Sequence, residues 1–235
     1  MKSVAIFRHF HTEGPGYFGD YLAQHGIPWQ LVPLDQGAAV PTEASAYSGL
    51  VFMGGPMSVN DELPWIAPVL ELIRAAVAKD VPVLGHCLGG QLMSKALGGV
   101  VSRNTIKEIG WGEVRVANNG EATSWFRGHL PRFTTFHWHG ETFAIPAGCT
   151  PLLSSVWCQN QAFALGPHLA LQCHVEMTRP LVESWCDSGR REIERSGSPA
   201  VQSVAAILED VDARVAALHA VADTVYAHWV GGLRR

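Results

Sequence analysis

The chain has 235 residues, of which 47% are hydrophobic and 16% are charged, and its formal net charge is −4. This length and apolar content suit one large or two small well-packed globular domains. The negative charge and the lack of a Lys/Arg run argue against a nucleic-acid-binding surface. No apolar stretch is long enough to span a bilayer, so we expect no membrane-spanning segment.

The first hundred residues alternate between strand and helix patterns. Apolar runs predict strands at Val4–Phe7, Trp29–Leu34, Leu50–Met53 and from Val81 up to Gly85, and helical spacing or stop signals predict helices at Tyr17–Gln24, Pro64–Lys79 and Gly90–Leu97. This alternation implies a flavodoxin-like, doubly wound α/β fold whose mainly parallel sheet carries helices on both faces. In such sheets, ligands bind at the carboxyl ends of the strands.

The middle and the end of the chain have different patterns. Short strands are predicted at Gly112–Val116, Arg132–Trp138, Leu152–Val156 and Gln161–Leu165. The tail from Pro199 to Trp229 carries an apolar stripe at helical spacing. We therefore expect a main domain over residues 1–190 and a C-terminal helical extension over 199–231 that packs on the same domain, with a charged, solvated linker over 190–198. A docking face for a partner or a second subunit is the alternative reading of the stripe.

The five cysteines indicate the compartment. Their number is odd, and Cys87, Cys149, Cys158, Cys173 and Cys186 show neither a CxxC spacing nor a disulfide pattern. A reducing cytoplasm is the simplest location for such a chain. The segment Met1–Phe7 is too short and too polar at its flanks for a signal peptide. We expect a cytoplasmic protein.

Cys87 lies in the pattern Gly85-His86-Cys87-Leu88-Gly89, between an apolar run and a helical pattern. A nucleophile on a sharp turn between a strand and a helix has this arrangement, and glycines are needed where Cβ atoms would clash. The N–H groups of the following helix favour the reactive thiolate. An inert, buried cysteine is the alternative, and the flanking glycines argue against it.

Two further segments supply partners for Cys87. His174 and Glu176 follow an apolar run that begins at His168. If that strand continues to Glu176, both side chains share one face, and the carboxylate can hold the imidazole in one tautomer. Gly54-Gly55-Pro56 follows another predicted strand, and exposed N–H groups of Gly55 and Leu88 would stabilise an oxyanion.

These three segments, in this order and spacing, resemble the signature segments of class I (triad-type) glutamine amidotransferases. The similarity covers roughly residues 1–187 and is strongest to stand-alone, GMP-synthase-like domains. It implies a catalytic triad of Cys87, His174 and Glu176. Residues 136–143 resemble the family loop over the bound glutamine, so the resemblance implies substrate-binding roles for Gly54, Gln91, Trp138 and Gly140.

The chain departs from the family pattern in two respects. Val175 stands where the family has Pro between the catalytic His and Glu, and Val is compatible with a strand. No synthetase domain is expected after the extension. The ammonia acceptor, a separate synthetase subunit and the oligomeric state therefore stay open.

The resemblance implies a glutaminase-type reaction in which a γ-glutamyl thioester forms on Cys87 and ammonia leaves. A γ-glutamyl peptidase with the same triad and a catalytically silent binding module are the alternatives. No cofactor is expected. His9-x-His11 and His137-x-His139 each place two imidazoles on one face of a strand, but nothing in the sequence fixes a third ligand. We therefore expect no metal site.

Overall fold

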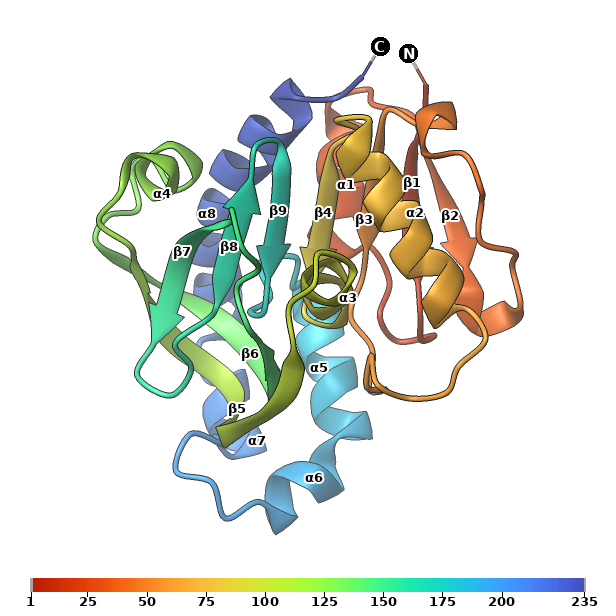
Figure 1. Ribbon diagram of the computed structural model, residues 1–235. Coiled ribbons are helices and arrows are strands. Elements are labelled where there is room, and N and C mark those ends of the chain that lie inside the picture. Colours follow the sequence, from red (N-terminus) through yellow and green to blue (C-terminus); the bar gives the residue numbers. More distant parts are fainter. Residues whose placement is uncertain (1, 235) are drawn as a thin grey trace.

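A nine-stranded mixed sheet runs through the computed structural model, which describes residues 2–234 (Figure 1). The strand order is β2-β1-β3-β4-β9-β8-β7-β5-β6. Five neighbouring strands are parallel, namely β2 (Trp29–Pro33), β1 (Val4–Arg8), β3 (Gly49–Phe52), β4 (Val83–His86) and β9 (His168–Leu171). Antiparallel pairing then adds β8 (Ala162–Leu165), β7 (Thr150–Ser155), β5 (Val101–Val116) and β6 (Arg132–Phe143).

Helices cover both faces of the parallel strands. Helices α2 (Ile66–Ala78) and α3 (Leu88–Ala96) lie in front of the sheet in Figure 1, and α8 (Val211–Gly231) lies behind it near α1 (Gly16–Gln24). Shorter elements complete the fold: α4 (Gly120–Trp125), α5 (Arg179–Ser188), α6 (Arg190–Arg195), α7 (Val204–Leu208) and the 3₁₀ turns Leu34–Gln36 and Ala44–Ala46. The predicted doubly wound sheet with helices on both faces is confirmed.

The two faces of the sheet form separate hydrophobic cores. In β1, Val4 and Ile6 join the core shared with α1 and α8, whereas Ala5 and Phe7 join the core shared with α2 and α3. This alternation follows from the two-residue period of a strand. Because both faces are covered, the inner parallel strands β1, β3, β4 and β9 are largely apolar, as the sequence pattern indicated. Among the described helices, none combines the length and the apolar character needed to cross a membrane.

Strand β5 is much longer than the predicted strand Gly112–Val116. Five of the six residues from Ser102 to Lys107 are polar, so no alternating pattern reveals its first half. Its register with β6 shifts between Arg103 and Glu108. Helix α4 was not predicted at all. The Asn119 side chain accepts a hydrogen bond of 2.8 Å from the Ala122 N–H, so Asn119 caps this short helix.

The segment 190–198, predicted as a solvated linker, is mostly exposed but contains a helix. Residues Arg190–Arg195 form α6, which buries Ile193. Its Glu192 pairs with Lys107 and accepts a 3.0 Å hydrogen bond from Trp138 Nε1. The charged composition therefore concealed a helix that buries one apolar residue and makes two polar contacts with the β5–β6 hairpin.

Helix α8 shares the core behind the parallel strands. Its Tyr226 and Trp229 are 0% and 1% exposed, and both rings pack edge-on against Phe18 of α1, with centroid distances of 4.8 and 5.6 Å. Trp229 also lies against Gly49 at the start of β3, where an added Cβ would come within 2.7 Å of the indole. We propose that residues 1–190 and 199–231 unfold as one unit.

Trp229→Ala tests this proposal. Removing a fully buried indole costs about 3–5 kcal/mol, so we expect a large fall in the free energy of unfolding with one cooperative transition. Urea unfolding followed by circular dichroism measures both. Trp157→Ala, at a 41% exposed position, is the control and should change little. A separate early transition for α8 would contradict the proposal.

Candidate active site

Several loops meet at the carboxyl end of the parallel strands and surround a cavity of about 650 Å³. Six of the predicted site residues line this cavity, namely Gly55, Cys87, Gln91, Trp138, Gly140 and His174. Gly54 and Leu88 adjoin the lining residues Gly55 and Cys87 in the chain, and Glu176 contacts the lining residue His174. The structure therefore brings together segments that are separated by more than a hundred positions in the chain.

Cys87 occupies a strained turn between β4 and α3. Its backbone has φ 50° and ψ −104°, an unusual conformation for a residue with a side chain. The turn is tightly packed: a Cβ on Gly89 would lie 2.0 Å from the Phe52 carbonyl oxygen, and one on Gly90 would lie 2.5 Å from that of Leu171. The glycines thus let the start of α3 insert between β3 and β9.

His174 and Glu176 form a buried pair beside Cys87. The distance between His174 Nδ1 and Glu176 Oε1 is 2.6 Å, and the two residues are 1% and 2% exposed. The expected strand does not extend through them, because β9 ends at Leu171. His174 is instead held by β6: its N–H donates to the Phe136 carbonyl at 2.8 Å, and its own carbonyl accepts from Thr135 Oγ1 at 2.9 Å.

The pair stabilises charge inside the protein. Burial opposes ionisation of both groups, but neighbouring charges outweigh it. His86 and His174 lower the pKa of Glu176 to about 2. Against the effect of burial, Glu176 and Cys87 raise the pKa of His174 well above 6.5. His174 Nε2 makes no hydrogen bond to a described residue, so this nitrogen is available on the Cys87 side of the ring.

His86 is a site residue that sequence reasoning missed. Its Nε2 lies 3.7 Å from Glu176 Oε2 and 3.4 Å from the hydroxyl of Tyr226. Burial lowers the pKa of His86, and the neighbouring Glu176 opposes this shift. A contact chain thus runs from α8 through His86 and Glu176 to His174. The sequence signal was a histidine at the end of an otherwise apolar strand.

Glu13 is a second residue that the sequence did not reveal. It lines the cavity, and its carboxylate lies against Gly54, where an added Cβ would be 2.7 Å from Glu13 Oε2 and 3.4 Å from His174 Cε1. Burial raises the pKa of Glu13 to about 7, although His174 opposes the shift. No local motif surrounds Glu13; only the fold brings the loop after β1 to His174.

The backbone donors near Cys87 are free. Among residues 2–234, neither the Gly55 N–H nor the Leu88 N–H donates a hydrogen bond. Leu88 opens α3, so its N–H has no partner within the helix. A Cβ on Gly55 would lie 2.9 Å from the Leu88 side chain, so the two residues are neighbours.

Polar and aromatic side chains line the rest of the cavity. Gln91 Nε2 donates to Gln172 Oε1 at 3.1 Å, and the Gln172 amide lies 3.5 Å from Cys87 Sγ. The Trp138 carbonyl lies 3.9 Å from the same sulfur, and its indole packs edge-on against Trp185. Gly140 lies against Lys107. Carboxylates of Glu13, Asp61, Glu141 and Glu192 make the lining acidic.

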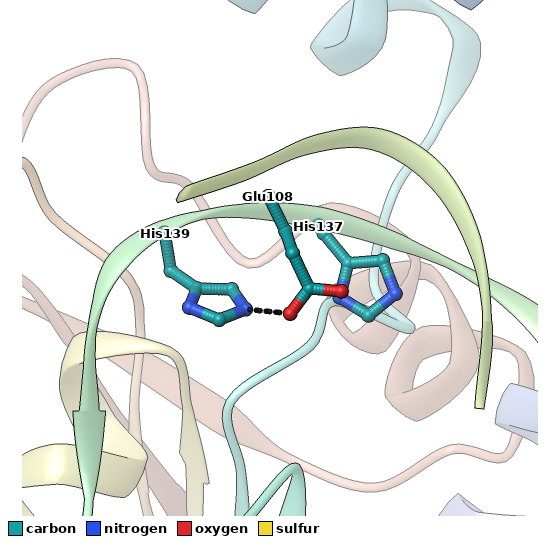
Figure 2. A group of neighbouring side chains, drawn as sticks. All are labelled: Glu108, His137 and His139. Carbon is teal, nitrogen blue, oxygen red and sulfur yellow. Dashed lines mark ion pairs between the residues drawn. The ribbon is translucent and has the colours of Figure 1, made fainter. Parts of the chain in front are cut away.

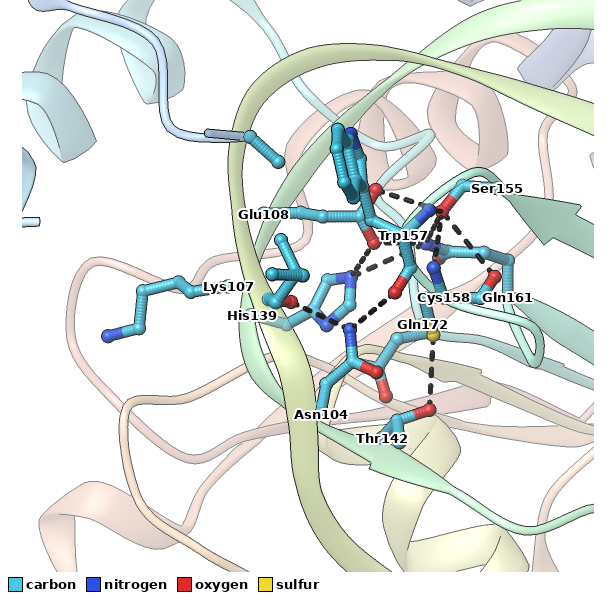
Figure 3. Close-up of polar contacts among 12 residues, drawn as sticks. Asn104, Lys107, Glu108, His139, Thr142, Ser155, Trp157, Cys158, Gln161 and Gln172 are labelled. Atoms are coloured by element: carbon cyan, nitrogen blue, oxygen red, sulfur yellow. Dashed lines mark hydrogen bonds and ion pairs between the residues drawn. The ribbon is translucent and has the colours of Figure 1, made fainter. Parts of the chain in front are cut away.

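The two His-x-His pairs have different surroundings. His9 and His11 lie beyond the end of β1, with His9 buried and His11 exposed, so they do not share the face of a strand. His137 and His139 lie on the inward face of β6, and Glu108 of β5 joins them (Figure 2). Figure 3 shows the polar contacts that surround Glu108 and His139, which include Ser155 and Gln161.

Comparison with known proteins identifies the family. The model for class I glutamine amidotransferases matches residues 18–180. A crystal structure of a glutamine amidotransferase from Methylobacillus flagellatus superposes with a TM-score of 0.98 at 44% identity, covering 100% of this chain and 96% of that one.

Curated relatives differ in length and in name. The glutamine amidotransferase-like protein YfeJ of Salmonella typhimurium is 31% identical over 84% of this chain and 85% of its own. GMP synthase of Ectopseudomonas mendocina is 30% identical over 85% of this chain, which spans only 37% of that enzyme. Gamma-glutamyl peptidase 3 of Arabidopsis thaliana is 25% identical over 71% of both chains. The chain therefore belongs to the class I glutamine amidotransferase family, whose members include enzymes that hydrolyse the glutamine amide.

Proposed function

We propose that this protein releases ammonia from the side-chain amide of glutamine through a γ-glutamyl thioester on Cys87. The observation that carries the proposal is a cysteine on a strained turn, in a cavity shared with a buried His174–Glu176 pair. A nucleophile, a base and an orienting carboxylate are the groups that this reaction needs.

In the proposed reaction, Cys87 Sγ attacks the amide carbon and His174 accepts the thiol proton. Glu176 holds His174 through Nδ1, so that Nε2 faces the sulfur. The N–H groups of Gly55 and Leu88 stabilise the oxyanion of the tetrahedral intermediate. His174 then protonates the leaving nitrogen, ammonia departs, and water activated by His174 hydrolyses the thioester to glutamate.

The remaining cavity residues suit an amino acid substrate. We assign substrate positioning to Gly54, Gln91, Trp138 and Gly140, which surround Cys87 at or near the cavity wall. The acidic lining attracts the α-ammonium group of the substrate and repels anionic small molecules. No cofactor takes part in any step.

The five free cysteines support a cytoplasmic location, since a reducing compartment preserves them.

A γ-glutamyl peptidase activity is the second candidate. The similarity to gamma-glutamyl peptidase 3 over 71% of both chains favours it, and the cavity of about 650 Å³ leaves room for a leaving group larger than ammonia. A separate synthetase that accepts ammonia is the partner consistent with the GMP synthase similarity. A silent binding module is disfavoured, because all three groups of the proposed triad are present.

Steady-state kinetics on glutamine and on a γ-glutamyl dipeptide test the proposal. We expect the isolated protein to turn over at least one of them unaided, and Cys87→Ser to lose nearly all activity while folding normally, because a hydroxyl is a weaker nucleophile than a thiolate. His174→Ala should lose most activity as well. Cys186→Ser, at a cysteine outside the cavity lining, is the matched control. Negligible turnover of both substrates by the folded protein would contradict the unaided reaction and indicate an obligate partner.

The contact between His86 and Glu176 predicts a shift in pH dependence. Replacing His86 by Leu removes an interaction that lowers the pKa of Glu176, so Glu176 should become protonated at a higher pH. We therefore expect the acid limb of kcat/KM to move to higher pH, with kcat reduced roughly 10- to 100-fold and KM little changed. Tyr226→Phe should shift the limb in the same direction by less. An unchanged acid limb in His86→Leu would show that His86 only packs.

Glu13 predicts a separate inflection near neutral pH. Because its pKa is about 7, the carboxyl is neutral below this pH and ionised above it. An ionised Glu13 stabilises the His174 imidazolium, so wild-type kcat/KM should rise by roughly three- to tenfold as the pH increases through 7. Glu13→Gln should lack this rise and keep the other limbs. Identical pH profiles would contradict a role for Glu13, and Glu62→Gln on the exposed surface is the control.

A further inference from the structure

Three metal-ligating side chains converge on the inward face of the β5–β6 hairpin (Figure 2). One ligand atom from each of Glu108, His137 and His139 lies within 4.8 Å of the other two. The register explains the convergence: Glu108 pairs with His139, and His137 lies two residues earlier on the same face of β6. The three residues are only 3%, 1% and 5% exposed.

His139 is oriented as a metal ligand would be. Its Nδ1 lies 3.0 Å from the Glu141 carbonyl oxygen, which can only accept a hydrogen bond, so Nδ1 carries a proton. With Nδ1 turned to this carbonyl, Nε2 points at Glu108 Oε2, 3.1 Å away. A cation placed between them would bind the Nε2 lone pair and the carboxylate oxygen together. Metal-binding histidines ordinarily donate their other N–H to a carbonyl in this way.

His137 provides the second, independent observation. Neither of its ring nitrogens makes a hydrogen bond to a described residue, although the side chain is 1% exposed. Buried imidazoles ordinarily have a partner. Figure 2 shows the His137 ring beside the carboxylate of Glu108. A ligand that accepts a nitrogen lone pair would satisfy this side chain.

Gln161 directs its side-chain amide at the cluster (Figure 3). Its Oε1 is also buried without a partner, while its Nε2 lies 2.8 Å from Glu108 Oε2 and 3.4 Å from His139 Nε2. Rotating the amide by half a turn exchanges oxygen and nitrogen, which occupy nearly the same space. Oε1 would then face the same point as Glu108 and His139.

We propose that Glu108, His137 and His139, with Gln161 as the fourth donor, bind a divalent first-row metal ion of the zinc class. Two imidazoles and a carboxylate are a common donor set for zinc, which binds such donors at about 2.0–2.2 Å. The ion would link β5 to β6, the strand that carries Trp138 and Gly140 at the cavity. The sequence placed two imidazoles together, and only the fold supplies Glu108.

Binding is best measured on the full chain carrying Cys87→Ser, because the catalytic thiol and His174 would otherwise bind zinc themselves. After treatment with a chelator, Zn²⁺ is added in a calorimetric titration, and Co²⁺ serves as a spectroscopic substitute. We expect one tight equivalent per chain, a higher Tm with Zn²⁺, and Co²⁺ ligand-field bands without a thiolate charge-transfer band. This binding measurement needs no turnover, so it tests the metal site even if the proposed reaction on glutamine is not observed.

Variants locate the ion. Glu108→Gln and His137→Gln should each weaken Zn²⁺ binding by more than about 100-fold. Loss of a residue that only supports a metal ligand weakens binding by about 10- to 100-fold, so a larger effect identifies a direct ligand. His11→Gln, at an exposed histidine, is the control and should bind as before. If a variant is destabilised, the Zn²⁺-dependent rise in Tm still separates it from the control. The proposal would be overturned if no tight equivalent of Zn²⁺ bound. It would also be overturned if all variants bound Zn²⁺ equally or showed the same rise in Tm, or if Co²⁺ gave a thiolate charge-transfer band.

Discussion

The buried contact between Glu176 and His174 is the interaction on which the rest of the site depends. Placing a charged pair away from water is costly, and such a pair is retained only with good geometry and further partners. The 2.6 Å contact provides the geometry, and His86 lies on the opposite side of the carboxylate. The backbone bonds from His174 to β6 fix the imidazole, so a segment outside any regular strand is still held rigidly.

Close backbone packing puts Cys87 in reach of this pair. Gly89 and Gly90 let α3 begin directly against β3 and β9, and the strain at Cys87 is maintained because both neighbouring strands are buried. Helix α8 supports the same region from behind, since Tyr226 reaches His86 from the core that it shares with α1. Buried contacts therefore connect the C-terminal helix to the residues at the cavity.

Local sequence rules explain which parts could be predicted. The glycines around Cys87, the Gly54-Gly55-Pro56 loop and the His-x-Glu spacing each reflect a constraint within a few residues, so they were visible in the sequence. Glu13, His86 and Glu108 act through contacts with distant segments, so no local rule assigns them a role, although His86 does stand out as a histidine in an apolar strand. The first half of β5 and helix α6 were missed for a related reason: polar residues mask an element whose few buried anchors, such as Ile193, depend on the fold.

Capture of the acyl-enzyme tests the central claim most directly. Glutamine, or a γ-glutamyl dipeptide, is mixed with the protein, the reaction is stopped with acid, and the intact mass and the modified peptide are determined. The account predicts a γ-glutamyl adduct on Cys87 with a productive substrate, and accumulation of the adduct if hydrolysis of the thioester is slow. Turnover that persists in Cys87→Ser, or an adduct on any of the other four cysteines instead, would contradict it.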